Sequence, residues 1–137
     1  MGMFHMPQQI EEGEHYKIEW DSDVDAAIFT WTQFASGETF REGANAAIEY
    51  AKQNDFSKMI VDSGGIQAHD NEDQVWIEEE WTPAMIDAGV DVFATVHNDS
   101  VIAEMDVTNM MEEMEDLPHD TFVTADFEEA REWIADQ

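Results

Sequence analysis

The stretch from residue 71 to residue 97, NEDQVWIEEEWTPAMIDAGVDVFATVH, constrains the fold of this chain more than any other. Its first half predicts an amphipathic helix, called the central helix below, because apolar residues recur at intervals of three and four. The residues of this apolar stripe are Ile77, Trp81, Ala84, Met85 and Ala88. Gly89 then supplies the left-handed residue with which helices often end, and VDVFATV predicts a strand buried in a sheet. Helix, glycine and strand form half of a βαβ unit, so the sequence predicts an α/β fold.

The rest of the chain extends this alternation of strands and helices. In chain order, the sequence predicts strands at 16–20 and 27–34, a helix from 36 or 39 to 54, a strand at 58–62, the central helix, a strand at 91–97, a broken helix at 100–114, a strand at 119–124 and a helix from 126. Thr39 and Glu42 are spaced as a capping box for the first helix. The order is ββαβαβαβα, in which helical crossovers require parallel pairing and the first two strands add an antiparallel edge. We therefore expect a mixed, mainly parallel sheet of five strands with about four helices.

The domain organisation is predicted to be simple. Residues 15–137 form one domain, and residues 1–14 form a flexible N-terminal arm, because Pro7 and Gly13 interrupt a polar segment there. The sequence has no cysteine, no apolar run near the roughly 18 residues of a membrane span, and no leader that would direct export. These absences predict a cytoplasmic protein without a membrane span.

Acidic residues outnumber basic residues by 33 to 5, which gives a net charge of -28. The regular apolar periodicity argues against disorder, so we interpret the charge as an adaptation to high concentrations of monovalent salt, where the screening length falls to about 3 Å. The alternative is an acidic decoy that imitates nucleic acid. A decoy concentrates its charge on one face, whereas acidic residues occur in every segment of this chain. The scarcity of Lys and Arg also argues against direct binding to nucleic acid.

The segment from about residue 16 to residue 134 resembles the STAS and SEC14-like group of small proteins, the SpoIIAA-like superfamily. The resemblance lies in the element order and in DQVWIEEEWTPAMIDAGVDVFATV, followed by the methionine-rich EEMED segment. It implies a STAS fold and a single-domain protein that performs no chemistry, and the charge adds that this member comes from a halophile. The expected function is that of a non-enzymatic binding or regulatory domain for an unknown protein or small ligand. The alternative is a SEC14-like carrier of an apolar small ligand.

Candidate binding residues lie in the loops that follow the parallel strands, since ligands of such sheets bind at the carboxyl ends of the strands. The candidates for contact with a ligand or partner are Ser63, Gly64, Gly65, His69, His97, Asn98 and Ser100. The alternative interpretation is that the glycines turn the chain and that Asp70 or Asn71 caps the central helix.

Ser63 is also a candidate phosphorylation site, which the sequence argues against. The regulatory members of the group that this chain resembles carry Asp-Ser-Ser-Gly in the corresponding loop, and the second Ser is the usual acceptor. This chain has Asp62, Ser63, Gly64 and Gly65, so Ser63 would serve only in a shifted register. The charge of Asp62 would oppose a phosphate beside it.

No catalytic or metal-binding pattern is present in the sequence. The five histidines are dispersed without HxH or HExxH spacing, so we expect neither metal nor cofactor. Asp62 ends a strand, as a phosphoacceptor would, but the chain lacks the lysine that a receiver domain has near its last strand. A hydrolase would need Ser63 or Ser100 within hydrogen-bond reach of a histidine. The expectation is a protein that is not an enzyme.

An apolar groove is predicted beneath the central helix, because Pro83 should kink that helix around residues 79–81. The groove residues are Trp76, Trp81, Met85, Met110, Met111 and Met114. The alternative is that these side chains only fill the core, as methionine often does. A closed cavity between the central helix and the methionine-rich helix would favour the carrier function. An edge strand in the first hairpin and tryptophans on the surface would favour a homodimer.

The charge generates the first testable prediction. Stability should rise as salt is added up to molar concentrations, because screening weakens the repulsion among the carboxylates. Thermal or urea unfolding followed by circular dichroism at several salt concentrations measures this. A midpoint that does not change with salt would contradict the halophilic interpretation.

Overall fold

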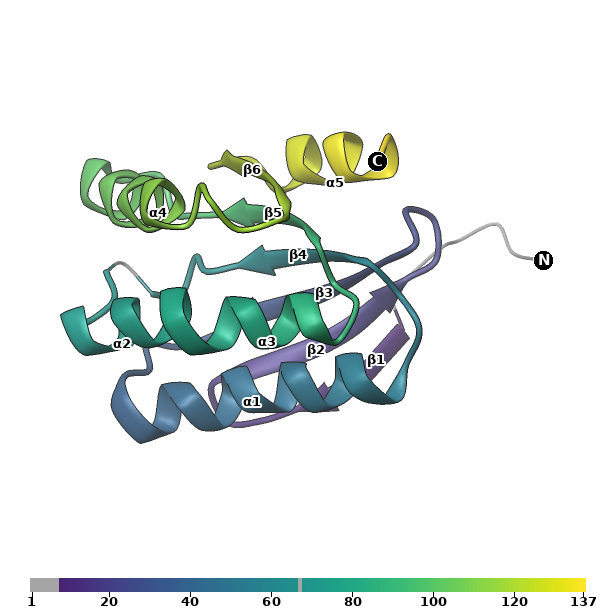
Figure 1. The fold of residues 1–137 in the computed structure, drawn as a ribbon, viewed down its shortest axis with the longest axis horizontal. Coiled ribbons are helices and arrows are strands. Elements are labelled where there is room, and N and C mark those ends of the chain that lie inside the picture. The colour runs from purple at the N-terminus through teal and green to yellow at the C-terminus, as the bar shows by residue number, and fades with distance from the viewer. Residues whose placement is uncertain (1–7, 67) are drawn as a thin grey trace.

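The computed structural model describes residues 8–66 and 68–137, which form an α/β protein as predicted (Figure 1). Its strands are β1 (Gln8–Glu12), β2 (Tyr16–Asp21), β3 (Ala26–Trp31), β4 (Lys58–Asp62), β5 (Val92–Val96) and β6 (Asp120–Thr124). Its helices are α1 (Gly37–Gln53), α2 (Asn71–Trp76), the π-helical turn η1 (Ile77–Trp81), α3 (Thr82–Asp87), α4 (Val101–Glu113) and α5 (Phe127–Ala135). The central helix is the continuous run of α2, η1 and α3.

The six strands form one mixed sheet in the order β1-β2-β3-β4-β5-β6. The pairs β1–β2 and β2–β3 are antiparallel, and the pairs from β3 to β6 are parallel. The predicted hairpin and the parallel crossovers are therefore confirmed, but the predicted number of five strands is wrong.

The additional strand, β1, lies within the segment that we predicted to be a flexible arm. That prediction is wrong for residues 8–12, which pair with β2, whereas residues 1–7 lie outside the described part of the chain. The physical reason is that an edge strand is held by main-chain hydrogen bonds to its neighbour. The sequence QQIEE does not alternate between apolar and polar residues, so periodicity could not reveal it.

The two faces of the sheet are covered by different helices, and β3 shows how. Ala27, Phe29 and Trp31 pack with α1 and the central helix, whereas Ala26 and Ile28 pack with α5. This alternation follows from the two-residue period of a strand. A smaller apolar cluster holds α4 on the same side as α1 and the central helix. Figure 1 shows α1 and α3 side by side along the strands.

The predicted stripe of the central helix lies against the sheet and α1. Trp81 and Met85 are buried, and Ile77, Ala84 and Ala88 are half-buried at the edge of the same core. The indole Nε1 of Trp81 donates a hydrogen bond of 2.8 Å to the carbonyl of Ala44 in α1. Gly89 ends the helix at a φ of 103°, the left-handed conformation that we predicted.

Where the sequence predicted a kink before Pro83, the helix contains the π-helical turn η1. The N–H of Thr82 donates to the carbonyl of Ile77, five residues earlier. Pro83 has no N–H, and its ring would crowd the carbonyl of residue 79 in a regular helix. A π turn is one of the recognised ways in which a helix accommodates such an interruption.

The first helix begins at the earlier of the two positions that the sequence predicted. Its N-cap residue is Ser36, and Thr39 lies in the first turn, so the capping box of Thr39 and Glu42 is wrong. The cap comes from outside the helix, since the buried carboxylate of Asp73 accepts a 3.0 Å hydrogen bond from the N–H of Gly37. A contact between residues so distant in sequence could not be predicted from local spacing.

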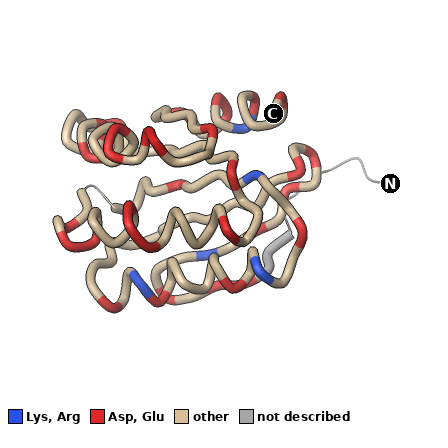
Figure 2. Tube along the Cα trace, in the orientation of Figure 1, with Lys and Arg blue, Asp and Glu red and all other residues tan. Residues whose placement is uncertain are grey.

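Acidic residues occur on every helix and along the loops (Figure 2). The five basic residues lie on α1, α5, β2 and β4. No helix in residues 8–66 and 68–137 is long and apolar enough to cross a membrane.

Truncation of Trp81 tests whether its ring is part of the core. Trp81→Ala should lower the free energy of unfolding by about 3 to 5 kcal/mol, because the change leaves a cavity and removes the bond to Ala44. Urea unfolding at constant molar salt measures the loss. Val75→Ala, at an exposed position of the same helix, is the control and should change it by less than about 0.5 kcal/mol. A loss under about 1 kcal/mol for Trp81→Ala would contradict the assignment.

Candidate functional site

The loop after β4 contains four of the predicted binding residues, and two of them have structural roles. The buried hydroxyl of Ser63 donates a 2.9 Å hydrogen bond to the carbonyl of Val96, which ties the loop to β5. A Cβ on Gly65 would lie 2.5 Å from the carbonyl oxygen of Trp31, so only glycine fits there. Gly64 is exposed and donates its N–H to the side chain of Asp62. These contacts fit the alternative interpretation given above, in which the glycines turn the chain.

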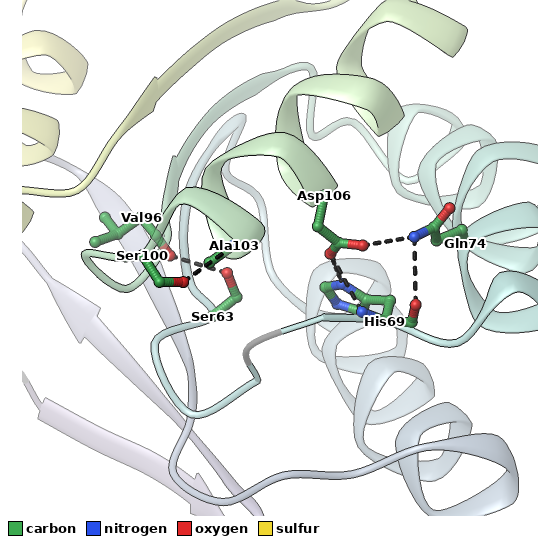
Figure 3. A network of polar contacts seen from close by, with 7 residues as sticks. All are labelled: Ser63, His69, Gln74, Val96, Ser100, Ala103 and Asp106. Atoms are coloured by element: carbon green, nitrogen blue, oxygen red, sulfur yellow. Dashed lines mark hydrogen bonds and ion pairs between the residues drawn. The ribbon is translucent and has the colours of Figure 1, made fainter.

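His69 is the fourth residue of this loop, and it meets Asp106 on the inner side of α4 (Figure 3). The imidazole Nδ1 lies 2.6 Å from Asp106 Oδ2, and the backbone N–H of His69 donates to the same oxygen at 3.2 Å. Each side chain is only 6% exposed. Because a carboxylate only accepts hydrogen bonds, Nδ1 carries a hydrogen in this pair.

Gln74 of α2 completes the network. Its Nε2 donates to Asp106 Oδ1 at 2.5 Å and to the carbonyl of His69 at 3.3 Å. The three residues therefore join the loop after β4, the start of the central helix and α4. The sequence analysis missed Asp106 and Gln74. The signal for Asp106 was an acidic residue at a position that shares the inner face of α4 with Val107 and Met110.

A cavity of about 60 Å³ lies beside this network, between the central helix, α4 and the sheet. The central helix contributes Ile77, Trp81 and Thr82 to its lining, and α4 contributes Val107, Met110, Met111 and Met114. The sheet contributes mainly Phe29, Val61, Phe93 and Thr95. The cavity is thus mostly apolar, and it occupies the place where the sequence predicted a groove.

Two of the predicted groove residues lie elsewhere. Met85 is fully buried in the core formed with α1, so it is part of the packing. Trp76 packs edge-on against Phe40, and the guanidinium of Arg41 lies 5.4 Å from the centre of the indole ring. The residue spacing placed Met85 on the apolar side of the helix, but it could not show which side chains face α1 and which face α4.

His119, which precedes β6, lines the opposite end of the cavity and was also missed. Its Nδ1 lies 3.1 Å from the carbonyl of Leu117. Its Nε2 is buried and has no hydrogen-bond partner among the described residues. His69 follows the carboxyl end of β4, whereas His119 precedes the amino end of β6. The cavity lining therefore has one histidine near the carboxyl ends of the parallel strands and one near their amino ends.

The remaining candidates, His97, Asn98 and Ser100, lie at the carboxyl end of β5, in or beside a separate and open cleft. His97 Nδ1 lies 2.8 Å from the carbonyl of Asn98. The hydroxyl of Ser100 caps α4 by accepting the N–H of Ala103 at 3.1 Å. Within the described residues, neither Ser63 nor Ser100 forms a hydrogen bond with a histidine, which is the contact that a Ser–His hydrolase would need.

Carboxylates lie close together at the boundary between the central helix and α4, outside the cavity lining. Burial raises the pKa of Glu78 in η1, and the charges of Glu113 in α4 and of Glu79 raise it further. Glu78 and Glu113 thus repel each other across the boundary between the central helix and α4. No group of three or more metal-ligating side chains occurs in the parts of the chain that the structure describes.

Comparison with known proteins adds no assignment. No protein-family model matches the chain, and no curated protein matches it. The function therefore has to be argued from the geometry of the site.

Removal of Asp106 tests whether the network holds α4 in place. Asp106→Ala should lower the free energy of unfolding by about 1.5 to 3 kcal/mol, because it leaves buried donors on His69 and Gln74 unpaired. Urea unfolding at constant molar salt is the measurement. Glu104→Ala, an exposed acidic position of the same helix, is the control and should have an effect below about 0.5 kcal/mol. Equal effects of the two substitutions would show that the network adds no stability.

Proposed function

We propose that this protein is a non-enzymatic binding domain whose cavity, between the central helix and α4, holds a small apolar ligand. The observation that carries the proposal is the cavity itself, which has aromatic and methionine side chains on its walls and few polar groups. Sites for small molecules commonly combine an apolar lining with a few polar groups in this way. The proposed setting is a cytoplasm with a high concentration of monovalent salt, which the acidic surface supports.

The cavity would have to enlarge to accept a ligand of ordinary size. Its volume of about 60 Å³ is well below the roughly 150 Å³ of an engineered protein cavity that binds benzene. Met110, Met111 and Met114 are the side chains that can make room, because methionine is unbranched and changes rotamer easily. Met111 is half-buried, so its movement would also open the cavity toward the surface.

The element that can admit a ligand is α4. Val107 and Met110 of α4 form a small apolar cluster of their own with Met114, the residue that caps its end. Its polar attachment to the neighbouring segments is the contact of Asp106 with His69 and Gln74. A helix held by a small cluster and one polar network separates from the core at lower cost than α1, which has six buried residues.

The same architecture is consistent with the proposed kinship to the STAS and SEC14-like group. An antiparallel hairpin is followed by four strands in sequence order, with α1, the central helix and α4 on one side. Within that group, the carrier function fits the cavity better than a phosphorylation switch does. A kinase would have to expose a Ser63 hydroxyl that is buried against β5.

A second candidate function is the binding of a protein partner, which the outer side of α4 favours. Val101, Ile102 and Met105 are 70%, 58% and 57% exposed, an unusual concentration of apolar surface on a chain this acidic. The tryptophans give no such support, since all five are buried or half-buried. A homodimer would therefore have to use α4 or an edge strand rather than tryptophan side chains.

Filling the cavity tests the proposed ligand site. Val107→Phe places a ring in the space that an apolar molecule would occupy, so it should abolish binding of the probe toluene. Titration of ¹⁵N-labelled protein with toluene, followed by amide chemical shifts in molar salt, measures the binding. Native mass spectrometry of the wild-type protein should in addition detect a co-purified small molecule that Val107→Phe lacks.

Val101→Phe is the matched control, because it makes the same change on the exposed side of α4. This variant should bind toluene as the wild type does. Absence of toluene binding to the folded wild-type protein, or equal binding by Val107→Phe, would contradict the proposed function.

A further inference from the structure

Among the described residues that line the cavity, His119 alone has a buried side-chain nitrogen or oxygen without a hydrogen-bond partner, its Nε2. Buried polar groups in proteins nearly always have a hydrogen-bond partner, and leaving one unpaired is costly. The imidazole ring lies with its edge toward Phe93, at a centroid distance of 6.1 Å, and His119 itself is part of the cavity lining. A molecule in the cavity is therefore the available source of the missing partner.

The other nitrogen of the ring determines what kind of partner is needed. Nδ1 lies 3.1 Å from the carbonyl oxygen of Leu117, and a carbonyl oxygen can only accept. Nδ1 must then carry the hydrogen, which leaves Nε2 of the neutral imidazole as a bare acceptor. The group that would satisfy it has to donate a hydrogen bond.

The rest of the lining excludes a charged ligand. None of the described residues that line the cavity is Lys or Arg, so a carboxylate would lie there without a counter-charge. The chain as a whole carries a charge of -28, which would repel an anion as it approached. An ammonium group would have no carboxylate in the lining to pair with. A neutral donor on an apolar body fits these conditions.

A bound water molecule is a weaker explanation for the same atom. A buried water molecule usually needs two to four polar partners. Apolar Phe93 lies beside the imidazole ring, and the nearest polar lining residue along the chain is Thr121. A water molecule at Nε2 would therefore have few other partners.

We propose that the cavity takes an apolar molecule with a hydroxyl group, a small alcohol or phenol, and that this hydroxyl donates a hydrogen bond to Nε2 of His119. The proposal rests on the proposed function, since it names the chemical class of the ligand of that site. His119 is a specificity-determining residue in this arrangement, and the methionine and aromatic side chains supply the contacts with the apolar body.

The test compares phenol with toluene, which differ by a hydroxyl in place of a methyl group. Dissociation constants for both probes are measured by ¹⁵N-amide titration on the wild type and on His119→Phe, which keeps an aromatic ring beside Phe93. The ratio of the toluene constant to the phenol constant should fall by about tenfold in His119→Phe, the contribution of one well-formed hydrogen bond. Taking this ratio in both proteins cancels the different hydration of the two probes. His15→Phe, at a histidine outside the cavity lining, should leave the ratio unchanged.

A second measurement on the wild-type protein keeps the test informative if His119→Phe does not fold. The imidazole ¹⁵N spectrum should show Nε2 of His119 without a hydrogen, and its resonance should shift with phenol but not with toluene. A hydrogen on Nε2 in the free protein, or a ratio unchanged in folded His119→Phe, would overturn this proposal while toluene binding upheld the ligand site. Binding of benzoate in preference to phenol would also overturn it. Failure of toluene to bind the folded wild-type protein would instead contradict the proposed function.

Discussion

The packing of the central helix against the sheet and α1 is the interaction on which the rest of the structure depends. Apolar contact has to supply the cohesion here, because the carboxylates of a chain with a charge of -28 repel one another. The buried carboxylates in the described residues each have a polar partner. Asp21 contacts Arg131, Asp73 caps α1, and Asp106 contacts His69. Each of these contacts joins two segments that are distant in sequence, so the few buried charges connect separate elements of the fold.

The sequence predicted those features that depend on local periodicity. These features are the stripe with Trp81 and Met85, the left-handed Gly89 and the buried strand after it. Each can be predicted from residues close by in the sequence. β1 escaped prediction because its polar residues are held through main-chain pairing with β2. The His69–Asp106 pair escaped because its members are 37 residues apart, and Asp106 has its role only when α4 lies over the loop. The existence of a cavity, as opposed to a filled core, depends on side-chain geometry that a sequence pattern does not contain.

The methionine-rich helix α4 combines two kinds of surface. Its inner side closes the cavity with Val107, Met110 and Met114, and its outer side exposes Val101, Ile102 and Met105. Repulsion between Glu78 and Glu113 acts along its boundary with the central helix, and salt weakens this repulsion. The ionic strength of the surroundings therefore acts on the same helix that would have to move for a ligand to enter.

The π-helical turn η1 changes the rotational register of the central helix. In a regular α-helix each residue advances by about 100°, so positions eight residues apart differ by about 80° around the axis. A π turn contains one extra residue, which reduces that difference to about 20°. Asp73 precedes this turn and Trp81 is its last residue, and both bond to α1, at Gly37 and Ala44. The extra residue thus lets the central helix direct the carboxylate of Asp73 and the indole of Trp81 toward the same neighbour. As a result, α1 is hydrogen-bonded to the central helix at its first turn and again near its middle.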